Sequence, residues 1–140
     1  MDGLKFFNSL GGPLHIEINQ EPRTHGMMEF APENALISKI GWEPYTYGEE
    51  DVQELTAEQL SVVVFPEPTI TLCGEAGIPT THYAPNGKHF TVRDMIAAVI
   101  ATEAQTRGQT EWFGGIDLHH VFFEGIYRNG DGGWRIAWGS

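Results

Sequence analysis

The chain has 140 residues, of which 19 are Asp or Glu and 8 are Lys or Arg, giving a formal net charge of −11. This length fits one domain over residues 1–140, because two domains would each lack a sufficient core. The acidic balance argues against nucleic acid or an anionic membrane as a partner, and no apolar run approaches the ~20 residues that span a bilayer. The single Cys73 and the lack of signal-peptide features predict a cytoplasmic protein.

The first 85 residues contain all eight prolines and predict short strands joined by irregular loops. Three segments have the composition or alternation of strands: 14–19, 62–65 and 69–73. Alternation in the first of these places His15 and Glu17 together on its outer face. The second is apolar and β-branched, which is typical of a central strand. Residues 54–60 predict a short acidic helix that Thr56 can cap.

The C-terminal part predicts one long helix. Thr91 is an N-cap candidate, and Asp94 stands three residues later at the position of a capping box. An apolar stripe at helical spacing follows, made of Val92, Met95, Ile96, Val99 and Ile100. Arg107 falls in the last turn, where its charge favours the negative end of the helix dipole. We therefore expect a helix over about 91–107.

A β-hairpin is predicted after the helix. Two aromatic-rich runs, 118–127 and 133–138, flank a turn of Asn, Asp and Gly residues that tolerate positive φ. One hairpin face is apolar and is expected to pack on the helix; it carries Val121, Phe123, Tyr127, Trp134, Ile136 and Trp138. The other face is mixed and is expected to line a pocket; it carries His120, Phe122, Glu124 and Arg135. The sequence thus predicts an α+β fold, mostly an antiparallel sheet with the 91–107 helix packed on one face and a C-terminal hairpin.

The segment 119–124 has the closest grouping of side chains that could take part in catalysis or metal binding. His120 and Glu124 supply imidazole and carboxylate groups, which serve either as metal ligands or as an acid/base pair near neutral pH. On a regular strand these two residues lie about 13 Å apart, too far to bind one ion without a bulge. The structural alternative pairs Glu124 with Arg135 across the hairpin and gives His120 a buried hydrogen bond. The sequence leaves the metal and any cofactor unknown.

Further candidate ligand contacts lie outside the hairpin. His15 and Glu17 share a strand face about 7 Å apart, near enough for one ligand, although a solvated outer face gives the same pattern. Trp112, beside two glycines, suits an aromatic anchor for a ligand or a cap over the core. No Lys or Arg occurs between Lys39 and Lys88, and aromatic residues within this acidic stretch suit contact with a basic protein surface. A solvated loop whose aromatic side chains fold back onto the sheet gives the same pattern and is favoured slightly.

Two functions follow from these patterns. The first is a small acidic module that binds a small molecule or a basic protein surface, with a homo-oligomer as one form. The second is a small enzyme, an acid/base lyase, isomerase or hydrolase with or without a metal. In this enzyme His120 and Glu124 act as acid/base groups, while Arg135 orients an anionic substrate and Phe122 lines the pocket. Convergence of histidines or neighbouring carboxylates on one point would favour the enzyme.

Overall fold

The computed structural model describes residues 2–140, and its elements confirm the predicted α+β class. A four-stranded sheet has the strand order β11–β12–β8–β9. Its strands are β8 (Thr69–Cys73), β9 (Pro79–Tyr83), β11 (Phe122–Arg128) and β12 (Trp134–Gly139). Neighbouring strands are antiparallel except β12 and β8, which run parallel. The predicted hairpin is therefore joined through β12 to a second hairpin from the middle of the chain.

The other elements are short. Four two-stranded ribbons pair β1 (Leu14–Ile18) with β4 (Ile37–Trp42), β2 (Arg23–His25) with β3 (Met28–Phe30), β5 (Tyr45–Tyr47) with β6 (Val52–Glu54), and β7 (Val63–Phe65) with β10 (Phe90–Thr91). The two short helices are α1 (Gly3–Asn8) and α2 (Ala57–Leu60). Thr56 caps α2, as predicted. The prediction of a central strand over 62–65 is wrong, because β7 pairs only with the two-residue β10.

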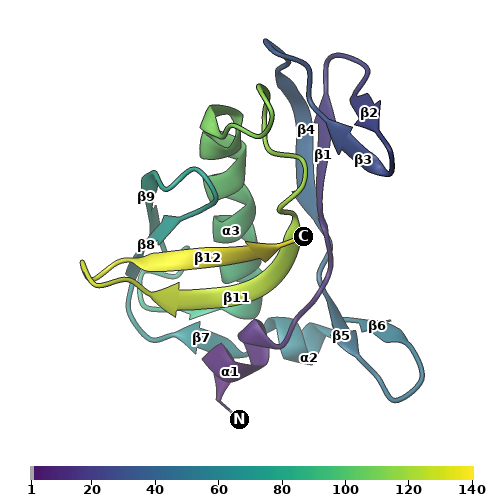
Figure 1. Cartoon of the computed structure of the whole chain (residues 1–140). Coiled ribbons are helices and arrows are strands. Elements are labelled where there is room, and N and C mark those ends of the chain that lie inside the picture. The colour runs from purple at the N-terminus through teal and green to yellow at the C-terminus, as the bar shows by residue number, and fades with distance from the viewer. Residues whose placement is uncertain (1) are drawn as a thin grey trace.

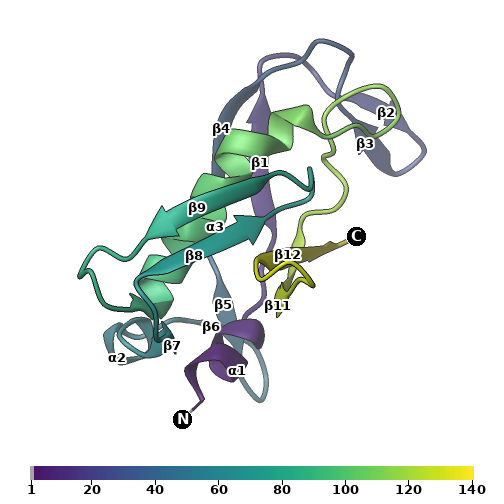
Figure 2. The same ribbon diagram turned by 90° about the vertical axis from the view of Figure 1, so that its left-hand side faces the viewer.

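The long helix α3 (Val92–Thr106) forms where the sequence predicts it. Thr91 Oγ1 accepts the N–H of Asp94 at 3.3 Å, and the Asp94 carboxylate accepts the N–H of Thr91 at 2.9 Å, which completes a capping box. The helix lies between the β8–β9 side of the sheet and the β1–β4 ribbon (Figure 1, Figure 2). Within residues 2–140, none of the helices has the length and apolar character needed to cross a membrane.

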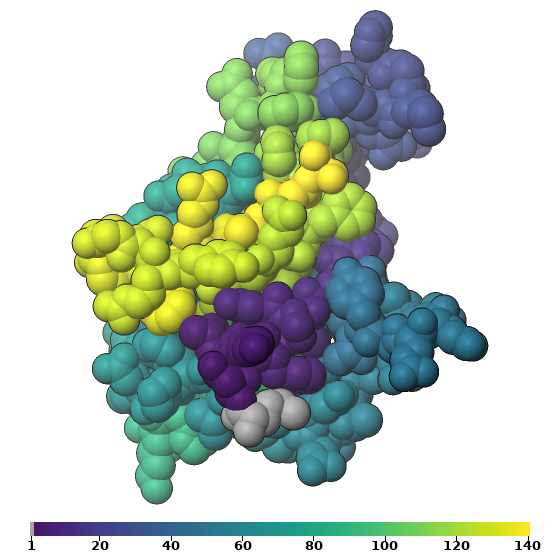
Figure 3. Space-filling model, turned by 60° about the horizontal axis from the view of Figure 1, so that its bottom comes forward, coloured from purple at the N-terminus to yellow at the C-terminus, as the bar shows by residue number. Residues whose placement is uncertain are grey.

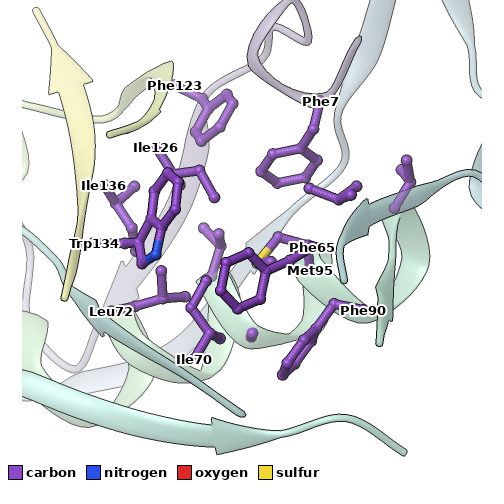
Figure 4. Close-up of a cluster of buried hydrophobic side chains, with 14 of the residues drawn as sticks. Phe7, Phe65, Ile70, Leu72, Phe90, Met95, Phe123, Ile126, Trp134 and Ile136 are labelled. Carbon is purple, nitrogen blue, oxygen red and sulfur yellow. The ribbon is translucent and has the colours of Figure 1, made fainter. Parts of the chain in front are cut away.

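The main core lies between α3 and the four-stranded sheet. Figure 4 shows side chains from α3, β8, β11 and β12 converging there, among them Met95, Leu72, Ile126 and Ile136. Phe7 of α1, a helix that sequence reasoning did not predict, is fully buried in the same cluster. Figure 3 shows α1 lying against the β11–β12 hairpin. The N-terminal helix therefore closes the core below the hairpin.

The hairpin departs from the predicted register in two places. Strand β11 begins at Phe122, so residues 118–121 precede the strand instead of belonging to it. A bulge then interrupts the pairing between Phe123 and Ile126, where Gly125 takes a φ of +107°. Beyond the bulge the alternation is shifted, so Ile126 is buried and Tyr127 is exposed. The prediction that Tyr127 belongs to the apolar face is therefore wrong, whereas Trp134, Ile136 and Trp138 are buried as expected.

The side chain of Asn8 binds both backbone groups of Ile126, the first paired residue after the bulge. Its Nδ2 donates to the carbonyl of Ile126 at 3.0 Å, and its Oδ1 accepts the Ile126 N–H at 2.8 Å. A Cβ on Gly125 would lie 2.7 Å from the Tyr127 hydroxyl and 3.1 Å from Asn8. Glycine is thus required both by the positive φ and by this close approach.

Candidate functional site

Three ionisable side chains converge beside the C-terminal end of α3. Glu75 follows β8, whereas Asp117 and His120 lie in the segment that leads from α3 to β11. One ligand atom from each of the three lies within 4.8 Å of the others. His120 Nδ1 is 2.8 Å from Asp117 Oδ2 and 3.9 Å from Glu75 Oε1. In Figure 2 the turn after β8 lies beside the α3–β11 segment, which explains how residues so distant in sequence meet.

Asp117 organises the segment that carries His120. Its Oδ1 accepts the backbone N–H groups of His119 at 2.8 Å and His120 at 3.0 Å, while Oδ2 faces the His120 ring. The N–H of Asp117 donates to Thr110 Oγ1 at 2.9 Å. The side chain of Asp117 is only 5 % exposed. This carboxylate therefore satisfies two backbone N–H groups that no strand pairs with and holds residues 117–120 in a tight turn before β11.

The two carboxyl groups of the site have opposite electrostatic surroundings. Burial raises the pKa of Glu75, and the nearby Asp117 carboxylate adds to this, against the lowering effect of Arg107. Burial also acts to raise the pKa of Asp117, but hydrogen bonds from the backbone of His120 and His119 and from the His120 ring outweigh it. The pKa of Asp117 is therefore held below its usual value. Asp117 is ionised at neutral pH, whereas ionisation of Glu75 is opposed.

A buried ion pair underlies the site. Arg107 and Glu103 are both 0 % exposed, and Nη2 of the arginine lies 3.0 Å from Oε1 of the glutamate. The sequence-based expectation for Arg107 was a charge at the end of the helix dipole. The structure instead buries it beneath the α3–β11 segment, where Nη1 donates to the carbonyls of Asp117 and His120.

Trp112 forms an aromatic wall beside the two histidines. Its ring stacks on His119 with centroids 5.1 Å apart and planes inclined by 8°, and it meets the edge of His120 at 4.8 Å. The next residue, Phe113, is exposed and has a φ of +53°, a left-handed conformation that is uncommon outside glycine. Trp112, predicted as a ligand contact, thus lies next to His120.

Other residues predicted as ligand contacts lie elsewhere. His15 and Glu17 are exposed on β1, as the alternation predicts. They line two adjoining clefts of about 490 and 370 Å³. The larger cleft is also lined by Glu21, Glu29 and Leu118, which lie outside β1. Neither residue belongs to the group formed with His120.

The predicted partnership of His120 with Glu124 and Arg135 does not form. Among residues 2–140, no hydrogen bond or ion pair joins the Glu124 side chain to His120 or Arg135. The Glu124 carboxylate lies over Gly139, where a Cβ would be 2.7 Å from its Cδ. Arg135 is exposed opposite Tyr127, and Phe122 is exposed opposite Gly139. The physical reason is that His120 precedes the strand, so strand alternation does not set its direction.

Sequence reasoning missed Glu75 and Asp117. The spacing of Asp117 and His120, three residues apart after a glycine pair, is typical of a carboxylate that caps a turn and was the available local signal. Glu75 had no such signal, because it reaches the site through long-range contacts, namely the pairing of β8 with β12 and the hydrogen bond from its N–H to Glu103. Comparisons with models of protein families, with curated proteins and with solved structures found no match for this chain.

Proposed function

We propose that this chain binds a divalent transition-metal ion through Glu75, Asp117 and His120. The observation that carries the proposal is the approach of one ligand atom from each side chain to within 4.8 Å of the others. Zn²⁺ takes oxygen and nitrogen ligands at about 2.0–2.2 Å, which separates them by about 3.4 Å in a tetrahedral site. Spacings of 2.8 and 3.9 Å lie on either side of this value. Small side-chain movements would therefore seat an ion.

The charge of the site supports a divalent ion. Three carboxylates, those of Glu75, Glu103 and Asp117, lie near a single guanidinium, that of Arg107. With all four ionised, two negative charges remain, and a divalent cation would neutralise both. Burial is the main cause of the raised pKa of Glu75, and the neighbouring carboxylates of Asp117 and Glu103 add to it. The ligand types also fit, since imidazole with carboxylates suits Zn²⁺, Mn²⁺ or Fe²⁺.

The coordination would be incomplete without solvent. His120 and Glu75 are 27 % and 19 % exposed at their side chains, so an ion can enter from water. Three protein ligands leave a position for water or an added ligand, as in catalytic zinc sites, whereas structural sites use four protein ligands. Binding would displace the proton that His120 Nδ1 shares with Asp117. Metal binding at His120 corresponds to the metal-assisted form of the small enzyme predicted from the sequence, with Glu75 and Asp117 in place of Glu124.

A second function, acid/base catalysis without a metal, is favoured by the hydrogen bond between Asp117 and His120. This bond keeps the proton of the neutral ring on Nδ1 and leaves Nε2 free to accept a proton from a substrate. Catalysis of this kind corresponds to the metal-free form of the small enzyme predicted from the sequence. Asp117 then takes the place of Glu124 as the carboxylate that acts with His120.

Titration calorimetry of metal-stripped protein with Zn²⁺ tests the proposal. We expect the wild type to bind one equivalent and His120→Ala to lose more than about 100-fold in affinity, beyond the loss typical of groups that only orient ligands. His15→Ala and Glu124→Ala are matched controls, because both remove exposed candidates outside the site. Their affinity should equal that of the wild type. A wild type that binds no Zn²⁺, or a His15→Ala variant as impaired as His120→Ala, would contradict the proposal.

We also retain the macromolecular partner and the compartment as proposals. The acidic stretch between Lys39 and Lys88 would contact a basic protein surface. A homo-oligomer is a separate form of the module. Light scattering after size-exclusion chromatography tests self-association, and a monomer at high concentration would exclude it. A free Cys73 suits the reducing cytoplasm, which fractionation of cells tests.

A further inference from the structure

The two segments that supply the candidate ligands do not pair with each other directly, because β12 lies between the strands that flank them. Glu75 comes from the turn after β8, and Asp117 and His120 come from the segment before β11. Between them lies the buried pair of Glu103 and Arg107, one helical turn apart at the end of α3. Both side chains are fully buried, so neither is available to an ion in solvent.

Each member of the pair holds a different segment. Oε1 of Glu103 accepts the backbone N–H of Glu75 at 3.1 Å. Nη1 of Arg107 donates to the carbonyl of Asp117 at 3.2 Å and to that of His120 at 2.8 Å. The ion pair itself, at 3.0 Å, completes a continuous path from one ligand segment to the other. The pair therefore adds a side-chain link between Glu75 and the Asp117–His120 turn, in addition to the link that β8, β12 and β11 make through the sheet.

The pair is poorly explained as a source of stability alone. Burying two charges carries a large desolvation cost, and well-packed apolar residues often serve stability as well or better. Here the hydrogen bonding is also incomplete, because Oε2 of Glu103 and Nε of Arg107 are buried without a partner. A Cβ on Gly74 would lie 2.6 Å from both Glu103 oxygens, so the backbone of the Glu75 segment approaches this carboxylate as closely as glycine permits.

We propose that Glu103 and Arg107 are positioning residues of the metal centre, an inference that rests on the proposed function. They do not touch the ion. They hold the three ligands at the mutual distances that an ion requires, in the way that groups behind metal ligands commonly do. Removing either side chain leaves Glu75, Asp117 and His120 in the protein but removes the side-chain link between the two segments.

Zn²⁺ affinity of side-chain variants tests this inference. Glu103→Ala and Arg107→Met should each lose about 10- to 100-fold in affinity, the range found when groups behind metal ligands are removed. Glu103→Gln keeps an oxygen for the N–H of Glu75 and should recover most of the loss. Arg107→Lys should remain impaired, because an ammonium group lacks the planar fork that donates to two carbonyls and a carboxylate together.

A control separates positioning from general destabilisation. Val99→Ala opens a cavity on the same helix in the main core, so it should lower the melting temperature without changing Zn²⁺ affinity. The absorption spectrum of bound Co²⁺ gives a second readout, which should change in Arg107→Lys and stay unchanged in Val99→Ala. If Glu103→Ala or Arg107→Met does not fold, the comparison of Arg107→Lys with Val99→Ala decides the question.

The outcomes distinguish this inference from the function on which it rests. Binding of Zn²⁺ by Arg107→Lys and Glu103→Ala with wild-type affinity, while His120→Ala loses it, would overturn the positioning role alone. Equal losses of Zn²⁺ affinity in Val99→Ala and Arg107→Lys would also overturn the positioning role, because they would show a general effect of lower stability. No binding of Zn²⁺ by the wild type would overturn both.

Discussion

His120 Nδ1 lies 2.8 Å from Asp117 Oδ2, and the other oxygen of the same carboxylate accepts the backbone N–H of His120. Asp117 thus fixes both the ring and the main chain of the histidine that approaches Glu75. Because an ionised carboxylate only accepts hydrogen bonds, the neutral ring carries its proton on Nδ1. The site is therefore organised before a ligand arrives, which lowers the cost of ordering side chains on binding.

Replacing Asp117 with Asn should reverse the tautomer of His120. The amide would keep an oxygen for the N–H groups of His119 and His120, and its NH₂ group would then face Nδ1. The ring should move its proton to Nε2 so that Nδ1 can accept. Nitrogen chemical shifts of the imidazole report this directly. An Nδ1–H ring in Asp117→Asn would show that Asp117 does not set the tautomer.

The same substitution should reduce stability in a pH-dependent way. The pKa of Asp117 is lower in the folded protein than in the unfolded chain, so this carboxylate stabilises the fold above its unfolded pKa. That contribution is lost as pH falls through the folded pKa. We expect Asp117→Asn to cost about 1.5–3 kcal/mol at pH 7, the range for hydrogen bonds to a charged group. Urea unfolding at neutral pH and below about pH 4 should show the difference from wild type shrinking in acid.

Glu75→Gln should stabilise the metal-free protein at neutral pH. The pKa of Glu75 is raised on folding, mainly by burial, so its contribution to stability is complete below the unfolded pKa and is lost as pH rises through the folded pKa. A neutral amide avoids that loss. Melting temperatures should therefore favour Glu75→Gln at pH 7 and converge with wild type in acid, whereas Zn²⁺ binding is lost.

The exposed residue Glu124 provides the control for this prediction. Glu124→Gln should leave both the melting temperature and Zn²⁺ binding unchanged. A Glu75→Gln variant that is less stable than wild type at pH 7 would show that the carboxylate makes a structural contribution. Gain of stability with loss of binding is typical of a functional residue.

Asn8→Ala should destabilise the hairpin from a distant point in the sequence. It would leave the N–H and carbonyl of Ile126 without partners inside the bulge. We expect a cost of about 1–3 kcal/mol, the penalty for unsatisfied buried polar groups. Asn8→Asp keeps the acceptor for the Ile126 N–H and should cost less. Equal unfolding free energies for wild type and Asn8→Ala would contradict the role assigned to Asn8.

Local patterns predicted the elements whose contacts are local. Thr91 and Asp94 mark the start of α3 because both capping partners lie within one turn. The alternation of 14–19 predicted the exposure of His15 and Glu17, because only the other face of β1, which carries Leu14 and Ile16, packs on the core. In these cases the residues that decide the structure are adjacent in sequence.

The candidate site depends on contacts between distant residues, and this is why it was only partly predicted. His120 and Trp112, both chosen from the sequence, lie side by side, but Asp117 turns the chain before β11 and so separates His120 from the strand that carries Glu124. Asn8 stabilises the bulge from 118 positions away in the sequence. The parallel pairing of β8 with β12 cannot be read from alternation, and it brings Glu75 to the site.

Anomalous X-ray diffraction from crystals grown with Zn²⁺ tests the central claim most directly. We predict one anomalous peak between Glu75, Asp117 and His120, with a ligand atom of each about 2.0–2.2 Å from the ion. The peak should be absent in crystals of His120→Ala. No peak at this position in the wild type, or a peak held by His15 and Glu17 instead, would contradict the assignment of the metal centre.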